Sequence, residues 1–230
     1  LTAAATGLSE RAAVAAGIAA DSVLLFSPDH ATYYPGAKNM TLKVVFDRAD
    51  GKIVGAQAVG FGGTEKRIDV LATAIRAGMT ADDLADLDLC YAPPYSSAKD
   101  PVNMAGYVIG NIFRGTVRQH TWKDVERIAA DENALLLDVQ TRGEYEAAHL
   151  SGAVNIPVDE LRGRMGELDK SKTIYVNCYS GLRSYIACRM LASNGFRCSN
   201  LAGGIRFYKV VAEGGVYDEV SRHLCGVKVE

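Results

Sequence analysis

The stretch TIYVNCYSGLRSYIACRML, Thr173 to Leu191, joins a short apolar run to a helical pattern through a glycine-containing loop. Thr173 to Asn177 is typical of a buried strand, and a helix is predicted from Arg183 to Ser193. Cys178 therefore falls where a strand ends. In an α/β sheet, ligands bind beyond the carboxyl ends of the strands, where a helix N-terminus offers unpaired amides. We expect Cys178 to be a thiolate nucleophile in a loop that can cradle an anion.

Strand and helix patterns alternate on both sides of this stretch, from residue 115 to the end of the chain. Such alternation predicts an α/β domain over residues 115–230, with a parallel sheet flanked by helices. Each predicted strand is short and apolar enough to be buried on both faces. The predicted strands are Leu135–Val139, Val154–Ile156, Thr173–Asn177 and Cys198–Leu201, and the helices lie near Glu144 and over Asp159–Leu168 and Arg183–Ser193.

Residues 1–114 show a different order, in which strand signals stand together between helices. Alternating apolar residues from Met40 to Asp47, the dipeptide Asp50-Gly51 and the apolar run Ile53–Val59 predict a β-hairpin. This order predicts an α+β domain with an antiparallel sheet and helices. The other predicted elements are a helix over Ser9–Ala16, a strand over Ser22–Phe26, a helix over Thr64–Ala77, a short helix after Thr80 and a helix starting at Asp100-Pro101.

The composition of the 230-residue chain limits its class. With 25 basic against 27 acidic residues and 48% hydrophobic residues, it has the values of an ordinary globular protein. The balanced charge gives no electrostatic footprint for nucleic acid, and the longest apolar run, Ala12–Ala20, is shorter than the roughly 18 residues that a bilayer span needs. We expect neither a nucleic-acid nor a membrane partner. Because the chain begins LTAAATG without Met, we expect it to be part of a longer protein.

The cysteines are widely spaced and form no CxxC pair, so the sequence suggests neither a disulfide framework nor a metal site. A reducing, cytoplasmic setting follows as an expectation. Apart from Cys178, the cysteines that we consider are predicted to be small buried residues without a chemical role. The five cysteines are Cys90, Cys178, Cys188, Cys198 and Cys225.

Three motifs in the second domain resemble those of the rhodanese sulfurtransferases: LLLDVQTRGEYEAAHLSGAVNIP at 135–157, CYSGLRS at 178–184 and LAGG at 201–204. The resemblance implies that Cys178 takes up a sulfane sulfur as a persulfide, held by loop amides and Arg183. The donor would be a persulfide, polysulfide, thiosulfate or coenzyme A derivative. The residues implied for the substrate-binding loop are Tyr179, Ser180, Gly181, Leu182 and Ser184.

The sequence departs from the rhodanese pattern at three scaffold positions. Gln140, Ala148 and Tyr208 stand where the family more often has Arg, Gly and Trp. These positions leave the implied chemistry in place. His149 is expected to orient the backbone or Asp138 rather than to act as a base, since attack by a thiolate needs none.

Cys178 also has two alternative interpretations. It can be an inert cysteine at a buried strand end, because free cysteine is among the most buried residue types. It can also be the nucleophile of a cysteine phosphatase, whose loop places five residues between cysteine and arginine. Only four residues, Tyr179 to Leu182, separate Cys178 from Arg183. This shorter spacing favours the sulfur-transferring loop.

The first domain resembles the dimerisation domain of the pyridine nucleotide-disulfide oxidoreductases, within the coenzyme A-disulfide reductase and NADH oxidase branch. The motifs that carry this resemblance are YYPG at 33–36, GAQAVG at 55–60, KRIDVLATAI at 66–75 and YAPPYSSAKDPVNMAG at 91–106. The resemblance implies a homodimer. It also implies that Tyr33 and Tyr91 reach across the dimer to the partner's coenzyme A site. The alternative is that these two tyrosines only pack their rings on neighbouring loops.

Members of this family bind FAD and NAD(P)H in two domains that precede the dimerisation domain, each opened by a GxGxxG turn. The nearest candidate here, Gly60 to Glu65, has Glu where the last Gly belongs. We therefore expect no flavin, nicotinamide or metal in this chain, whereas FAD, NAD(P)H and coenzyme A are implied for a longer parent protein.

Together, the two resemblances imply a rhodanese-type sulfurtransferase that works through a Cys178 persulfide. The parent would be an FAD- and NAD(P)H-dependent coenzyme A-disulfide, coenzyme A-persulfide or polysulfide reductase. The alternative is a noncatalytic rhodanese and dimerisation module that docks on the reductase domains or presents persulfide to them.

Overall fold

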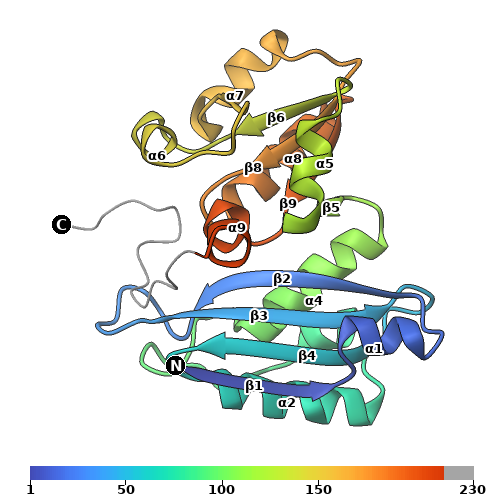
Figure 1. Ribbon diagram of the computed structural model, residues 1–230. Coiled ribbons are helices and arrows are strands. Elements are labelled where there is room, and N and C mark those ends of the chain that lie inside the picture. Colours follow the sequence, from blue (N-terminus) through green and yellow to red (C-terminus); the bar gives the residue numbers. More distant parts are fainter. Residues whose placement is uncertain (215–230) are drawn as a thin grey trace. The chain divides into compact units, whose positions relative to one another are not determined.

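The computed structural model describes residues 1–214, which fall into two compact units (Figure 1). The first unit is Leu1–Arg114, and the second begins at Gly115. Cys225 and the rest of residues 215–230 lie outside the described residues. Each unit has its own sheet and its own core, so each is described by itself.

The first unit contains a four-stranded antiparallel sheet in the order β1-β4-β3-β2. Its strands are β1 (Thr2–Gly7), β2 (Ala20–Pro28), β3 (Asn39–Asp47) and β4 (Ile53–Gly60). The predicted hairpin is confirmed: the amide of Gly51, at φ 75°, donates to the carbonyl of Asp47 (2.9 Å) and closes the turn between β3 and β4. Strand β1 was not predicted, because its alanine-rich sequence has low strand propensity. The backbone hydrogen bonds to β4, with which all six residues of β1 pair, hold this segment as a strand despite its low propensity.

Helices α2 (Thr64–Ala77) and α4 (Pro101–Phe113) pack on this sheet, α2 against β1 and β4 and α4 against β2. Leu71 of α2 and Ile109 of α4 meet the fully buried Leu42 and Val44 of β3 in one core. The helix starts follow the capping residues in the sequence. Asp100 caps α4 ahead of Pro101, Thr80 and Asp83 form a capping box on α3 (Ala81–Asp86), and Ser9 caps α1 (Glu10–Ala15).

The second unit contains a five-stranded sheet in the order β5-β9-β8-β6-β7, and every pair is parallel. Its strands are β5 (Gln119–His120), β6 (Ala134–Asp138), β7 (Val154–Asn155), β8 (Thr173–Asn177) and β9 (Arg197–Leu201). Both predicted fold classes are thus confirmed. The prediction that every strand is buried on both faces is wrong for β7, because it is an edge strand whose Val154 is 50% exposed. The two-residue β5 was not predicted.

Short helices flank the parallel sheet. The predicted helix over Asp159–Leu168 is shorter than expected: α7 ends at Arg164, and a single 3₁₀ turn, Met165–Glu167, follows. Glycines at 163 and 166 weaken a continuous helix there. The helices are α5 (Val125–Ala129), α6 (Arg142–Ala147), α7 (Val158–Arg164), α8 (Leu182–Ser193) and α9 (Gly204–Ala212), with a further 3₁₀ turn at Trp122–Asp124.

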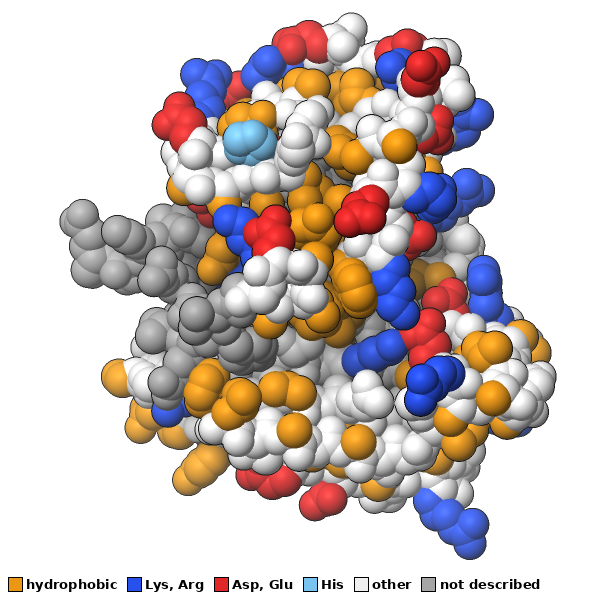
Figure 2. Space-filling model, in the orientation of Figure 1, with side chains coloured by type: hydrophobic (Ala, Val, Ile, Leu, Met, Phe, Trp, Pro, Cys, Tyr) orange, Lys and Arg blue, Asp and Glu red, His pale blue; other side chains and the backbone are white. Residues whose placement is uncertain are grey.

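The surface carries charges of both signs. On the face drawn in Figure 2, acidic and basic side chains lie interspersed, so neither sign gathers there. Within residues 1–214, no helix combines the length and the apolar character that crossing a bilayer requires.

Candidate active site

Cys178 lies at the carboxyl end of the central strand β8, immediately before the loop that leads into α8. Its side chain is fully buried. The sulfur accepts a hydrogen bond from the amide of Gly181 (3.2 Å) and lies 3.3 Å from the hydroxyl of Ser184. The single hydroxyl hydrogen of Ser184 can instead go to the carbonyl of Gly181 (3.2 Å). Ser184 can therefore donate to a thiolate and turn away from a thiol.

The start of α9 holds the carbonyl groups of this loop. The amide of Ile205 donates to the carbonyl of Cys178 (2.9 Å), and the amide of Arg206 donates to the carbonyl of Tyr179 (3.0 Å). In a trans peptide the carbonyl and the following N–H point in opposite directions. The amides of Tyr179 and Ser180 therefore point away from α9.

These amides remain available to a ligand. Among residues 1–214, the amides of Tyr179, Ser180 and Leu182 donate to no acceptor. They lie at the N-terminus of the twelve-residue helix α8, where the helix dipole favours an anion. The loop and the helix start thus form a backbone cradle beside the Cys178 sulfur, as the sequence predicts for an anion-binding loop.

Gly204 makes the contact between α9 and the loop possible. A β-carbon on this residue, at φ 63°, would lie 2.5 Å from the carbonyl oxygens of both Cys178 and Tyr179. Only glycine lets the two backbones approach so closely. The LAGG motif at 201–204 is therefore part of the cradle, although none of its side chains reaches the sulfur.

Arg183 makes a contact that the sequence analysis did not predict. Its guanidinium forms a two-point ion pair with Glu144 of α6, with Nη1 to Oε2 at 2.7 Å and Nη2 to Oε1 at 2.9 Å. Glu144 also accepts from the amide and hydroxyl of Thr141 and so caps its own helix. Burial acts to raise the pKa of Glu144, but the hydrogen bonds from Arg183 and Thr141 lower it overall. The fixed positive charge that the sequence predicts at Arg183 is thus paired with a carboxylate, and Arg183 joins α8 to α6.

A buried carboxylate lies at the end of the neighbouring strand β6. Asp138 accepts from the amide of Gln140 (2.8 Å), from the Gln140 side chain (3.0 Å) and from the Asn177 side chain (2.7 Å). Burial raises the pKa of Asp138, and these hydrogen bonds only partly offset the rise. Gln140 also donates to the carbonyl of Ala148 (3.1 Å). Asp138 and Gln140 therefore organise the loops after β6, a role for Gln140 and Asn177 that the sequence analysis missed.

His149 contacts the backbone, as predicted, but not Asp138. Its Nδ1 lies 2.7 Å from the carbonyl oxygen of Tyr145, and the two rings stack with centroids 4.0 Å apart. The Tyr145 hydroxyl in turn donates to the carbonyl of Ala153 (2.6 Å). This arrangement fixes the end of α6 and gives His149 no contact with the Cys178 sulfur.

The remaining described cysteines divide into two groups. Cys188 is buried and Cys198 is half-buried. Cys90 is exposed, so its prediction as a core residue is wrong. The apolar pattern before it ends at Leu89, the last residue of this segment that packs on the core.

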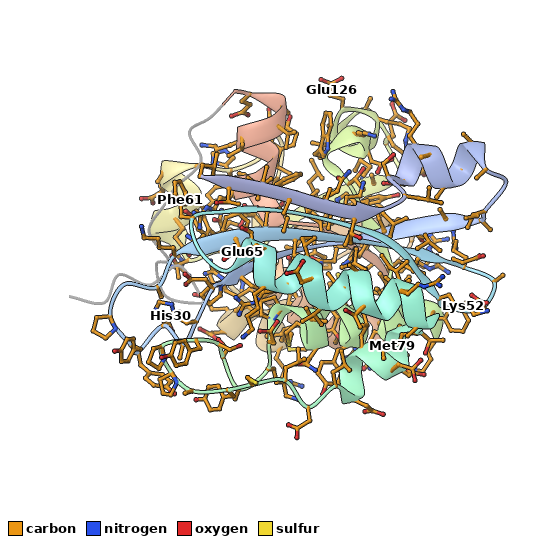
Figure 3. All side chains as sticks on the ribbon, turned by 90° about the horizontal axis from the view of Figure 1, so that it is seen from below. His30, Lys52, Phe61, Glu65, Met79 and Glu126 are labelled. Atoms are coloured by element: carbon orange, nitrogen blue, oxygen red, sulfur yellow. The ribbon has the colours of Figure 1, made fainter. Side chains whose placement is uncertain are left out.

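Cys90 lines a cavity of about 500 Å³ in the first unit, together with Tyr91, Asp29, His30, Glu65 and Lys66. Figure 3 shows His30 on the loop after β2 and Glu65 at the start of α2.

The structure brings Tyr33 and Tyr91 together. Their hydroxyl oxygens lie 2.7 Å apart, and the side chains are 73% and 48% exposed. The hydrogen bond to Tyr91 raises the pKa of Tyr33. Two exposed phenols that share a hydrogen bond form a polar surface site that can donate to or accept from a further molecule.

Arg67 holds together the two loops that carry these tyrosines. It is 1% exposed, and its Nη2 donates to the carbonyl of Asp29 (2.8 Å) and to the carboxylate of Asp100 (2.8 Å). Ser96 donates to the same carboxylate (2.7 Å). Burial acts to raise the pKa of Asp100, but the hydrogen bond from Arg67 and its charge lower it overall. Arg67 was not predicted as a structural residue, although an arginine on the buried face of a helix indicates such a network.

The turn from Gly60 to Glu65 does not fit a dinucleotide. A β-carbon on Gly62 would lie 2.6 Å from the Asp29 carboxylate, and one on Gly63 would lie 2.2 Å from Nη1 of Arg67. The space that a pyrophosphate would need is therefore filled by the side chains of Asp29 and Arg67. Within residues 1–214, no three His, Cys, Asp or Glu side chains gather as a metal site would require.

Comparison with known proteins identifies both units. The profile of the pyridine nucleotide-disulphide oxidoreductase dimerisation domain matches residues 1–101, and that of the rhodanese-like domain matches residues 121–209. A coenzyme A disulfide reductase of Staphylococcus haemolyticus (strain JCSC1435) is 49% identical over 85 residues, which make up 37% of this chain and 19% of that protein.

Two solved structures resemble both units together. A reduced Bacillus anthracis protein, CoADR-RHD, is 44% identical with a TM-score of 0.88, over 94% of this chain and 39% of that one. A NAD-dependent persulfide reductase from A. fulgidus is 41% identical with a TM-score of 0.80, over 89% of this chain and 37% of that one. The chain thus spans less than two fifths of these relatives. It consists of a pyridine nucleotide-disulphide oxidoreductase dimerisation domain followed by a rhodanese-like domain.

Proposed function

We propose that this chain transfers sulfane sulfur through a persulfide on Cys178. The observation that carries the proposal is the cradle around the sulfur: the Gly181 amide donates to it, and the amides of Tyr179, Ser180 and Leu182 lie beside it without an acceptor in the described structure. Amides and a helix N-terminus favour the negative charge that a thiolate and a persulfide both carry.

The proposed reaction has two steps. The Cys178 thiolate attacks the sulfane sulfur of the donor, the donor's S–S bond breaks, and its electron pair leaves with the remaining thiolate or sulfite. The negative charge stays on the terminal sulfur of the new Cys178 persulfide. An acceptor thiolate or cyanide then attacks that sulfur, which breaks the persulfide S–S bond and returns Cys178 to a thiolate. Neither step requires a protein base, which agrees with the hydrogen bonds of this site: the Cys178 sulfur is paired with Gly181 and Ser184, whereas His149 and Asp138 have other partners.

The two site residues after the loop have different proposed roles. Ser184 donates its hydroxyl to the anionic sulfur and returns it to the Gly181 carbonyl when the charge leaves. Arg183 is a positioning residue, because its guanidinium is paired with Glu144 and fixes the first turn of α8 against α6. Substrate contact falls to Tyr179, Ser180 and the exposed Leu182 at the rim of the loop.

We further propose that the chain is the C-terminal part of an FAD- and NAD(P)H-dependent coenzyme A-disulfide, coenzyme A-persulfide or polysulfide reductase. The names of the relatives support this assignment. FAD and the nicotinamide would supply electrons from other domains of the parent, since the Gly60 to Glu65 turn does not fit a dinucleotide. The parent would be a cytoplasmic homodimer, in which Tyr33 and Tyr91 contact the partner's coenzyme A site.

Mass spectrometry tests the Cys178 proposal directly. The chain is mixed with thiosulfate or with an organic persulfide, and its intact mass is measured without reductant. We expect a gain of one sulfur atom mapped to residue 178, and thiocyanate production with cyanide. Cys178→Ser should lose both, whereas Cys90→Ser, a change at an exposed cysteine of the other unit, should keep both. Thiocyanate turnover that survives in Cys178→Ser refutes the proposal and favours a noncatalytic docking or presenting module.

The parent protein tests how the two activities are joined. NADH-dependent reduction of a coenzyme A persulfide is compared in the wild type, in Cys178→Ser and in a mixture of separately expressed halves. We expect Cys178→Ser to lose most persulfide turnover but to keep the reduction of simple disulfides. The mixed halves should be slower than the fusion, because tethering raises the effective concentration of the intermediate. Equal persulfide turnover in Cys178→Ser would show that the rhodanese-like domain takes no part in that reaction.

A further inference from the structure

A pair of thiols in the second unit lies outside the Cys178 site. Cys188 is in α8 and Cys198 is at the start of β9, against which α8 packs. The Cys198 sulfur lies 3.3 Å from the carbonyl oxygen of Cys188. The register of β9 fixes this contact, because Cys198 pairs with Ile174 of the central strand. The fold thus places the Cys198 sulfur against the backbone of Cys188, ten residues earlier in the sequence, with the two thiols within hydrogen-bonding reach of each other.

The environment makes the two thiols chemically different. A hydrogen bond from Cys188 lowers the pKa of Cys198, and the amide of Ala192 and the charge of Arg118 lower it further against the effect of burial. The hydrogen bond to Cys198 and burial raise the pKa of Cys188. Cys198 is also the more accessible of the two, since Cys188 is 2% exposed. Cys198 therefore has the features of an attacking thiol, and Cys188 those of a sheltered partner.

We propose that Cys198 and Cys188 form a second thiol site, which reacts with small organic disulfides and closes into an intramolecular disulfide. The Cys198 thiolate attacks one sulfur of the disulfide R–S–S–R, forms a mixed disulfide and releases one R–S⁻. The Cys188 thiolate then attacks the Cys198 sulfur, breaks the mixed disulfide and releases the second R–S⁻. The two protein thiols are oxidised, the small disulfide is reduced to two thiols, and the two protons lost by the cysteines neutralise the released thiolates.

This site is separate from the one proposed above for sulfur transfer, although the charge of Cys178 is close enough to add to the rise in the pKa of Cys188. The sulfur of Cys178 has its hydrogen bonds within its own loop, from Gly181 and Ser184, whereas Cys198 faces the turn of α8 between Cys188 and Ala192. The new disulfide would tie β9 to α8, the helix whose first turn carries Arg183 and Ser184.

The test uses the full 230-residue chain with Cys178→Ser and Cys225→Ser, which leaves Cys90, Cys188 and Cys198. Oxidised glutathione is the probe, and intact mass with peptide mapping is the readout. Cys90 is an internal control, since it is exposed and belongs to the other unit. We expect Cys90 to hold a stable glutathione adduct, and the peptides of Cys188 and Cys198 to lose two hydrogens and join without an adduct.

Two further variants separate the steps. In Cys188→Ser the second step is blocked, so a glutathione adduct should accumulate on Cys198. In Cys198→Ser the buried Cys188 should remain a free thiol. Arg118→Gln should slow the reaction of Cys198 several-fold, whereas Arg118→Lys, which keeps the charge, should slow it less.

Clear outcomes would overturn the proposal. One is that Cys188 and Cys198 both stay reduced after Cys90 is fully modified. Another is that Cys198 takes no adduct in a Cys188→Ser chain whose circular dichroism is unchanged. If Cys188→Ser does not fold, the two-hydrogen loss in the chain with both cysteines still decides the question. Because Cys178 is absent throughout, failure here leaves the Cys178 proposal standing, and the reverse also holds.

Discussion

The guanidinium of Arg183 donates two hydrogen bonds, of 2.7 and 2.9 Å, to the carboxylate of Glu144, which lies 39 residues earlier in the sequence. The arginine that follows the Cys178 loop is thus paired with another residue, through which we expect it to act. It joins the first turn of α8, which carries Ser184 and follows Gly181, to α6, the helix that comes after β6 in the chain. The effect of replacing it should be on the placement of the loop rather than on substrate affinity.

Replacing the arginine therefore tests its role. Arg183→Lys replaces a planar guanidinium, which donates two hydrogen bonds to Glu144, by an ammonium group with a compact charge. One of the two hydrogen bonds is therefore lost. We expect the turnover number for sulfur transfer to fall about 10-fold with KM little changed, and stability to fall by about 1–2 kcal/mol. Steady-state kinetics and denaturant unfolding measure both. Arg189→Lys, on the same helix but away from the loop, is the matched control.

Glu144→Gln distinguishes positioning from direct binding. If Arg183 acts through Glu144, this variant should lower turnover in the same way as Arg183→Lys. A raised KM in Arg183→Lys, together with normal kinetics in Glu144→Gln, would instead make the arginine a substrate ligand.

The close approach of α9 to the loop predicts a sharp difference between two glycine variants. Gly204→Ala places a β-carbon 2.5 Å from the carbonyl oxygens of Cys178 and Tyr179, so the loop must move. We expect sulfur transfer to fall on the order of 10- to 100-fold. Gly195→Ala introduces the same strain of a positive φ, at 80°, but has no atom within 4 Å of the new β-carbon. It should lose stability and keep activity. Similar turnover in the two variants would show that the cradle does not depend on the Gly204 contact.

The buried imidazole of His120 predicts how acid affects the second unit. Burial lowers the pKa of His120 to about 4, although the charge of Asp124 opposes the shift. Because the folded pKa lies below the unfolded value of about 6.5, the stabilising contribution is complete above pH 6.5 and is lost as pH falls toward 4. The loss should reach roughly 3 kcal/mol.

Chemical denaturation at several pH values measures this loss. His120→Asn should flatten the dependence of the free energy of unfolding on pH between 6.5 and 4. His149→Asn removes an exposed imidazole and is the control. An unchanged slope in His120→Asn would assign the acid sensitivity to other groups.

The tyrosine pair predicts a spectroscopic change. The hydrogen bond to Tyr91 raises the pKa of Tyr33, so Tyr91→Phe should return the pKa of Tyr33 toward its ordinary value of about 10. Carbon-13 NMR of labelled tyrosine, followed against pH, resolves this titration. Tyr95→Phe, at a similarly exposed ring of the same segment, should leave it unchanged. A Tyr33 titration that does not respond to Tyr91→Phe would mean that the two hydroxyls are not paired in solution.

Local signals in the sequence predict much of the fold. The capping residues Ser9, Thr80 and Asp100 mark helix starts that the structure confirms, and Asp50-Gly51 marks the hairpin. Strands β1 and β5 were missed, because alanine-rich or two-residue segments become strands only through their neighbours in the sheet. Strand propensity depends on the type of each residue and not on a pairing partner that is distant in the sequence.

The candidate site shows the same division. The strand, the loop and α8 are contiguous, so the sequence places Cys178 and Gly181 correctly relative to each other. The contacts that shape the loop come from elsewhere: Glu144 from α6, and Gly204 and Ile205 from α9. A single sequence does not show which of its distant segments lie close together in the folded chain. The roles of Arg183 and Gly204 therefore became visible only in the folded chain.

The dependence of the loop on α9 also orders events during synthesis of the protein. A chain leaves the ribosome from its N-terminus, so Cys178 emerges before the amides of Ile205 and Arg206 that hold its loop. Until β9 and α9 have followed, the carbonyls of the loop have no fixed partners and its amides have no fixed direction. A nascent rhodanese-like domain thus carries Cys178 in a loop that lacks its backbone supports. Under the proposed mechanism, sulfur transfer would have to wait until β9 and α9 have been translated and have folded.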